Sequence, residues 1–288
     1  MSGFRAIAPW LLLAPALLAV LVFFVTPMAF LVFESFHDFS MTGGVGGLSL
    51  SNYQRLLTDP YYFNVLKTTF GIATLAACFS LLLGYPLALL LWKAPARLKG
   101  LLLVAIIAPL LISVIVRNFG WIVILDKYGM LNDLLKHLGF TGGFVENTHL
   151  FTTQAVLIGL VHVYLPFMVL AVYGALQKQQ SRYVDAARNL GANPFRAFLL
   201  ITLPLSLPGI VAGVTTVFAL ASGAYITVAV LGGSRVMVMS VLAYQQSLGL
   251  ANWQFGSAIA MVLLVGTIVI LQLFQRITRK AFLRAVTA

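Results

Sequence analysis

The chain has 288 residues, of which 61% are hydrophobic and only 9% are charged, and its formal net charge is +11. A soluble domain of this size cannot bury so much apolar surface, so most of the chain must face lipid or other membrane helices. The single cysteine, Cys78, excludes an intrachain disulfide and argues against a thiolate metal site; inside its apolar run it is expected to be a small core residue.

Six apolar runs are long enough to cross a hydrocarbon core of about 30 Å, which takes roughly 20 helical residues. All four tryptophans lie toward the ends of these runs, where indole rings favour the membrane interface. The first run is too long for a signal-peptide core and is interpreted as an uncleaved span. The sequence therefore predicts an all-α polytopic membrane protein with one transmembrane domain over 1–288, with spans near 10–33, 64–92, 100–125, 150–176, 204–232 and 253–275.

The charges predict the orientation. Six spans place both termini on one side of the membrane, together with the loops near 93–99 and 177–203. That side holds twelve of the eighteen basic residues but only one of the seven acidic residues, Asp185. By the positive-inside rule it is cytoplasmic. The excess positive charge therefore reflects topology rather than nucleic-acid binding.

The opposite side carries three longer segments. In 34–63, the residues from Asn52 to Leu57 are expected to form a short interfacial helix that ends near Asp59-Pro60. In 126–149, a short helix is expected at 129–138. The third segment, 233–252, contains Gln245 and Gln246 and is expected to return toward the membrane.

Polar residues inside the spans are candidates for a solute pathway, because polar groups at membrane depth are costly and usually face protein or water. Each has a plainer explanation. A snorkelling arginine beside an interfacial tryptophan equally explains Arg117 to Trp121, hydrogen-bonded packing is favoured for His162, and small-residue helix packing equally explains Ser222 to Thr227. The candidate pathway residues are Asn118, Trp121, His162, Tyr164, Ser222 and Tyr225.

Ser181 to Pro204 is longer and more patterned than a connector between two spans requires. Ser181 can cap a short helix whose first turn contains Asp185, and Gly191 can supply the left-handed residue that ends it. Asn193-Pro194 then predicts a second helix, with a capping Asn and Pro at the first helical position.

This pattern resembles the EAA loop of inner-membrane permeases of ATP-binding-cassette (ABC) importers. Asp185-Ala186-Ala187, Gly191 and Ile201-Thr202-Leu203-Pro204 meet every spacing of the family pattern, with Asp in place of Glu. The resemblance implies that the loop is a coupling helix that docks into a groove on the ATPase subunit. The residues implied in coupling are Tyr183, Asp185, Ala186, Ala187, Gly191, Ile201, Leu203 and Pro204.

From about Asn52 to Arg276 the chain also resembles permeases of spermidine/putrescine-type importers, for example in LLLGYPLALLL, RNFGWIVIL and LPLSLPGIVAG. The resemblance implies the type I importer fold, a second permease subunit, an ATPase dimer that holds ATP and Mg, and an extracytoplasmic solute-binding protein. No cofactor is expected on this chain. The implied solute is a polyamine, or a related amine or amino-acid derivative. In that group an acid often precedes the aromatic residue of the fifth span, and here Ala224 stands in its place.

Other functional classes receive less support. The sequence contains no P-loop motif, so the chain is not expected to hydrolyse ATP, and its four histidines are too scattered for a metal site. No span carries an acid near its middle, which argues against a gradient-driven carrier or channel, the main alternative. A membrane-embedded enzyme or scaffold would require a reactive cluster, and none is visible.

Overall fold

The chain is represented by a computed structural model that describes residues 13–39, 46–139, 148–179, 183, 186, 187, 189 and 191–287, with side chains to residue 278. Across these ranges the structure is helical, and its one β-type pairing is an isolated bridge between His37 and Leu48. Among the described residues, five helices are long and apolar enough to cross a membrane: Leu13–Ser35, Pro60–Lys93, Thr153–Gln177, Pro194–Ser222 and Trp253–Thr278. The pair Ala96–Leu111 and Val114–His137, bent by 95°, makes a sixth span if counted as one. The expected all-α polytopic fold is thus confirmed, with five or six spans.

The helices form two compact units, each described by itself. Unit 1 comprises residues 1–64 and 242–264, and unit 2 comprises 65–241 and 265–288. Three helices contribute to both units: α4 (Pro60–Lys93), α14 (Met239–Tyr244) and α15 (Trp253–Thr287).

Unit 1 contains η1 (Leu21–Val25), α2 (Thr26–Ser35), α3 (Ser51–Thr58) and η3 (Gln245–Gly249). The short helix expected from Asn52 to Leu57 is confirmed as α3. Its C-cap is Asp59, whose side chain accepts a hydrogen bond from the N–H of Tyr61 in the first turn of α4 (2.8 Å). The guanidinium of Arg55 lies 4.9 Å from the ring centroid of Phe255, a cation–π contact between α3 and the start of α15.

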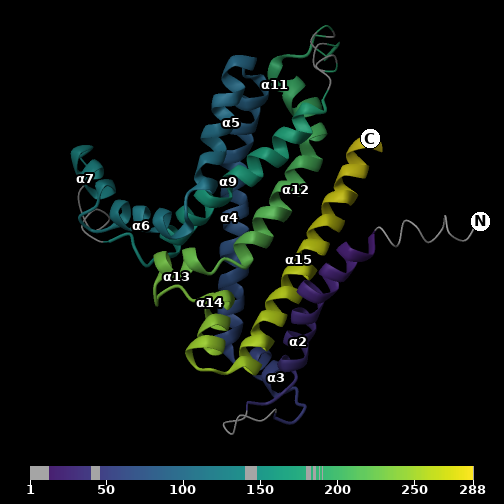
Figure 1. Cartoon of the computed structure of the whole chain (residues 1–288). Coiled ribbons are helices and arrows are strands. Elements are labelled where there is room, and N and C mark those ends of the chain that lie inside the picture. Colours follow the sequence, from purple (N-terminus) through teal and green to yellow (C-terminus); the bar gives the residue numbers. More distant parts are fainter. Residues whose placement is uncertain are drawn as a thin grey trace, which may run out of the picture. The chain divides into compact units, whose positions relative to one another are not determined.

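Unit 2 is built around α9 (Thr153–Gln177), which contacts α5 (Ala96–Leu111), α6 (Val114–Leu125), α12 (Leu203–Ser222) and α13 (Ile226–Gly232) (Figure 1). Thr152 caps α9 by accepting a hydrogen bond from the N–H of Ala155 (3.2 Å). At the contact of α9 with α12, a Cβ at Gly209 would lie 2.6 Å from the Cβ of Ala175. Glycine on α12 therefore sets the spacing of the two helices.

Two of the expected spans are interrupted. The run 100–125 breaks at Ile112 and Ser113, whose backbone is extended, and α6 then runs across the direction of α5 (Figure 1). Pro109 weakens the preceding turn because it has no N–H to donate. The run 204–232 breaks at Gly223–Tyr225, between α12 and α13. The apolar pattern continues through both breaks, so hydropathy alone could not place them.

The helix expected at 129–138 is confirmed as α7 (Met130–His137).

The expectation of a core position for Cys78 is wrong, because its side chain is exposed on α4. Leu75, Phe79 and Leu82 are exposed on the same helix at helical spacing. A membrane protein can leave such an apolar face to lipid or to another subunit.

Candidate functional site

The first candidate site is the segment Tyr183–Pro204. Asp185 lies outside the described residues, whereas Tyr183, Ala186 and Ala187 are helical. The N–H of Ala192 donates to the carbonyl of Ala187 (3.0 Å), and Gly191 between them has φ +85°. This is the closing hydrogen bond of a Schellman motif, so the predicted left-handed role of Gly191 is confirmed.

In the second half of the segment, the observed helix start also agrees with the one predicted from the sequence. The side chain of Asn193 accepts a hydrogen bond from the N–H of Arg196 (2.8 Å), and Pro194 begins α11 (Pro194–Ala197). Helical backbone then continues through η2 (Phe198–Thr202), which contains Ile201, into α12, which begins at Leu203-Pro204. A displacement of α11 would therefore be transmitted along one continuous helix into α12.

Several side chains of this segment are exposed on the surface of the chain. Tyr183 is 52% exposed and Phe195 is 68% exposed, and the small Ala186 is exposed as well. Exposed apolar patches on a protein mark sites of interaction with another protein or with a membrane.

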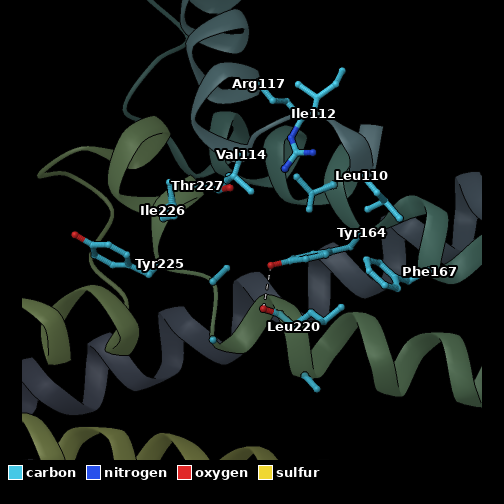
Figure 2. A pocket seen from close by; sticks show the side chains of 14 residues that line it. Leu110, Ile112, Val114, Arg117, Tyr164, Phe167, Leu220, Tyr225, Ile226 and Thr227 are labelled. Carbon is cyan, nitrogen blue, oxygen red and sulfur yellow. Dashed lines mark hydrogen bonds between the residues drawn. The ribbon is translucent and has the colours of Figure 1, made fainter. Parts of the chain in front are cut away.

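The second candidate site is a cavity of about 630 Å³ inside unit 2, where the two helix breaks meet (Figure 2). Ile112 lines it from the first break, and Gly223, Ala224 and Tyr225 line it from the second. Irregular backbone at membrane depth is tolerated where it lines a cavity, and transporters place solute sites at such interrupted helices. The remaining lining residues are Leu110, Val114, Arg117, Val163, Tyr164, Phe167, Ala219, Leu220, Ile226 and Thr227.

The polar groups of this pocket come from three elements. The guanidinium of Arg117 on α6 and the hydroxyl of Tyr164 on α9 point toward the cavity, and the Tyr164 hydroxyl donates to the carbonyl of Leu220 on α12 (3.1 Å) (Figure 2). The hydroxyl of Tyr225 points away from both, so the pocket wall is formed by other parts of Tyr225. Thr227 on α13 is 5% exposed.

The structure does not bring all the predicted pathway residues together. Trp121 and His162 line a different, largely apolar cavity of about 500 Å³. There the indole Nε1 of Trp121 donates to Nδ1 of His162 (3.1 Å), as the packing interpretation of His162 predicts. Ser222 is buried and donates to the carbonyl of Phe218 (2.7 Å), and Asn118 is 0% exposed behind the pocket wall, with its amide 3.4 Å from the hydroxyl of Thr227.

The stretch Arg117 to Trp121 was a candidate from the sequence, but Arg117 itself was not among the predicted pathway residues, because snorkelling explained it equally well. Its side chain is only 8% exposed, and its Nη1 donates to the carbonyl of Pro109 on α5. The guanidinium is thus held inside the protein rather than extended along its surface. An arginine within an apolar run, without an acid at helical spacing, was the available signal.

The described residues contain no group of three or more His, Cys, Asp or Glu side chains that could hold a metal ion. That this chain binds no cofactor stays a prediction.

The sequence matches the family of binding-protein-dependent transport system inner membrane components over residues 5–283. The chain belongs to this family. Its relatives include the spermidine/putrescine transport system permease protein PotB of Escherichia coli (strain K12), which is 36% identical over 231 residues, 80% of this chain and 83% of that protein. PotB of Haemophilus influenzae is 34% identical over 259 residues, 89% of this chain and 86% of that protein.

Solved structures show the same fold. A bacterial ABC transporter involved in the import of alginate has a chain with a TM-score of 0.78 at 18% identity, covering 97% of this permease and 99% of that chain. A chain of the MetNI methionine ABC transporter has a TM-score of 0.55 at 18% identity, covering 80% of this permease and 99% of that chain. The protein is therefore a multi-pass inner-membrane permease subunit of an ABC importer and not an enzyme, and the gradient-driven alternative is not favoured.

Proposed function

We propose that this permease imports a small nitrogenous solute: a polyamine such as putrescine or spermidine, or a related amine or amino-acid derivative. The similarity to PotB over 80% of the chain carries this assignment. The solute would be delivered by an extracytoplasmic binding protein, as the family description implies. The pathway would lie between this chain and a second permease subunit, with both termini of this chain in the cytoplasm.

The energy would come from an ATPase dimer that holds ATP and Mg, and this chain would contribute the docking surface. Tyr183 and Phe195 supply exposed apolar area, and the turn at Gly191 fixes the angle between the two short helices of the segment. ATP binding would close the ATPase dimer and displace this segment. Continuous helix from Pro194 to Ser222 would carry the displacement to the end of α12, where the pocket lies. Alternating access follows if that displacement opens the pathway outward.

The function is tested by purifying the tagged permease from native membranes in mild detergent and identifying the co-purifying subunits by mass spectrometry. The complex is then reconstituted into vesicles with its binding protein. We expect an ATPase and a second permease in the complex, and uptake of labelled amines that requires ATP. A stable chain that purifies alone and moves solute down a gradient would reject the proposal.

The docking role is tested by Asp185→Lys, which reverses the acid of the EAA-like pattern. We expect normal abundance in the membrane but at least tenfold lower uptake, because a positive charge replaces a negative one at the proposed contact. Asp133→Lys, a charge reversal on α7, is the matched control and should retain uptake. Wild-type uptake by Asp185→Lys would remove Asp185 from the coupling surface.

A further inference from the structure

The pocket at the two helix breaks has an unusual charge balance for a site that would receive amines. Arg117 is the one formally charged side chain among its fourteen lining residues, all of which lie in the described part of the chain. No described acidic residue lines the cavity, and the residue that follows the break at Gly223 is Ala224. A solute that carries only positive charges would meet a like charge in this pocket and no counter-charge from this chain.

The guanidinium of Arg117 is incompletely satisfied. An arginine has five N–H donors, and here Nη1 donates to the carbonyl of Pro109, whereas Nε is buried without a hydrogen-bond partner among the described residues. The side chain is 8% exposed and points toward the cavity (Figure 2). A buried charge without an anion is costly, so an anionic group entering the pocket would gain a counter-charge in the guanidinium.

The start of α6 adds positive potential to the same wall. Ile112 and Val114 line the cavity on either side of Ser113, the N-cap residue, whose side chain makes no capping hydrogen bond. The first N–H groups of a helix have no intrahelical acceptor, and the helix dipole favours a negative group there. Arg117 lies one turn further along this twelve-residue helix. The helix end and the guanidinium therefore favour the same kind of ligand group.

The facing wall has the opposite character. It contains the carboxyl-terminal end of α12, with Leu220 and Gly223, together with the rings of Tyr164 and Phe167. Carbonyl groups at a helix end and the faces of aromatic rings both favour a cation. The pocket thus has one wall suited to an anion and one suited to an ammonium group, within a volume appropriate to a small molecule.

We propose that this pocket binds a small amino-carboxylate, with the carboxylate at Arg117 and the start of α6, and the ammonium group toward α12 and the aromatic rings. The inference rests on the proposed import of a nitrogenous solute and narrows it to a zwitterion in place of a polyamine. Arg117 selects for the carboxylate.

The test compares two probes of similar length, 4-aminobutyrate and putrescine, of which only the first carries a carboxylate. The permease is purified with its partner subunits in lipid nanodiscs, without ATP or binding protein, and binding is measured by saturation-transfer NMR. We expect 4-aminobutyrate to bind at least tenfold more tightly than putrescine. Arg117→Met should weaken 4-aminobutyrate at least tenfold, and Arg117→Lys should restore part of the loss because it keeps the charge.

Arg235→Met is the matched control, because Arg235 is exposed and does not line the pocket. It should leave both affinities unchanged. Ala224→Asp keeps the test informative if the Arg117 variants do not fold. A carboxylate on the pocket wall should compete for the guanidinium, weaken 4-aminobutyrate and strengthen putrescine.

The inference is overturned if putrescine binds as tightly as 4-aminobutyrate, or if Arg117→Met binds 4-aminobutyrate like the wild type. It is also overturned if Ala224→Asp leaves the preference unchanged. ATP-dependent uptake of both probes in vesicles separates the two proposals. Uptake of putrescine without 4-aminobutyrate leaves the proposed function standing and rejects the zwitterion. Binding of 4-aminobutyrate with no ATP-dependent uptake of any amine rejects the proposed function and leaves the zwitterion site standing.

Discussion

The segment Tyr183–Pro204 and the pocket at the helix breaks differ in how the chain builds them. The segment is made by neighbours in sequence: Ala187 bonds Ala192 across Gly191, and Asn193 bonds Arg196. The pocket is made by residues more than a hundred positions apart, from Leu110 to Thr227, on five different helices. Local backbone rules govern the first, and long-range packing governs the second. Substitutions in the segment should therefore reduce uptake without loss of stability, whereas substitutions at the helix contacts should reduce the stability of the protein.

The largest effect on transport is expected for Gly191→Pro. Gly191 has φ +85°, and proline is fixed near −65°, so the turn between the two short helices cannot form. A Cβ at this position would meet no atom within 4 Å, so folding of the spans should be spared. We expect normal abundance and thermal stability in detergent, with uptake in vesicles reduced by at least tenfold.

Gly139→Pro is the matched control, because Gly139 has φ +84° and equally open surroundings but follows α7. Its uptake should stay close to that of the wild type. Equal loss of uptake in both variants would mean that the effect is general backbone strain rather than the coupling turn.

Gly209→Val tests long-range packing. A Cβ here would lie 2.6 Å from the Cβ of Ala175 and 2.7 Å from the carbonyl oxygen of Ala171. Overpacking of this kind typically costs about 1–3 kcal/mol. We expect α9 and α12 to separate, with a lower melting temperature in detergent and lower abundance, and loss of uptake as a consequence.

Gly174→Val on α9 is the control, because nothing lies within 4 Å of a Cβ at that position. It should retain the wild-type melting temperature. An unchanged melting temperature for Gly209→Val would show that the spacing of α9 and α12 does not depend on this glycine.

Asn193→Ala is a smaller change in the segment Tyr183–Pro204. It removes the cap that accepts from the N–H of Arg196, a loss of about 1 kcal/mol in typical helices. We expect a severalfold decrease in coupled uptake with no change in melting temperature, and recovery in Asn193→Asp, which can also cap. A lower melting temperature with unchanged uptake would show that this cap contributes to the stability of the protein and not to coupling.

The smallest effect is expected for Tyr164→Phe. The variant loses the hydrogen bond from the hydroxyl to the carbonyl of Leu220 and keeps the ring in the pocket. Such a bond contributes about 0.5–1.5 kcal/mol, so we expect a small decrease in melting temperature by scanning calorimetry. Tyr128→Phe is the comparison, because Tyr128 is 79% exposed and removal of its hydroxyl should leave the melting temperature unchanged. Equal decreases would mean that the Leu220 contact has no special role.

Much of the fold was predictable from the sequence, because the membrane restricts what a chain can do. Apolar runs of about 20 residues must be helices, since a spanning helix satisfies its own backbone hydrogen bonds. The local turns were predictable for a related reason. Gly191, Asn193 and Pro194 each have a backbone preference that acts within a few residues and needs no tertiary partner.

Only the tertiary structure decided where the long helices break and what meets there. The apolar pattern is continuous through Ile112-Ser113 and through Gly223–Tyr225, so it carries no signal for either break. Arg117 was visible in the sequence as a charge in an apolar run. That it is buried, bonded to Pro109 and aimed at a cavity with Tyr164 depends on the packing of α5, α6, α9 and α12. Hydropathy records how a residue partitions between water and lipid, whereas a pocket depends on which distant side chains the packed helices bring together.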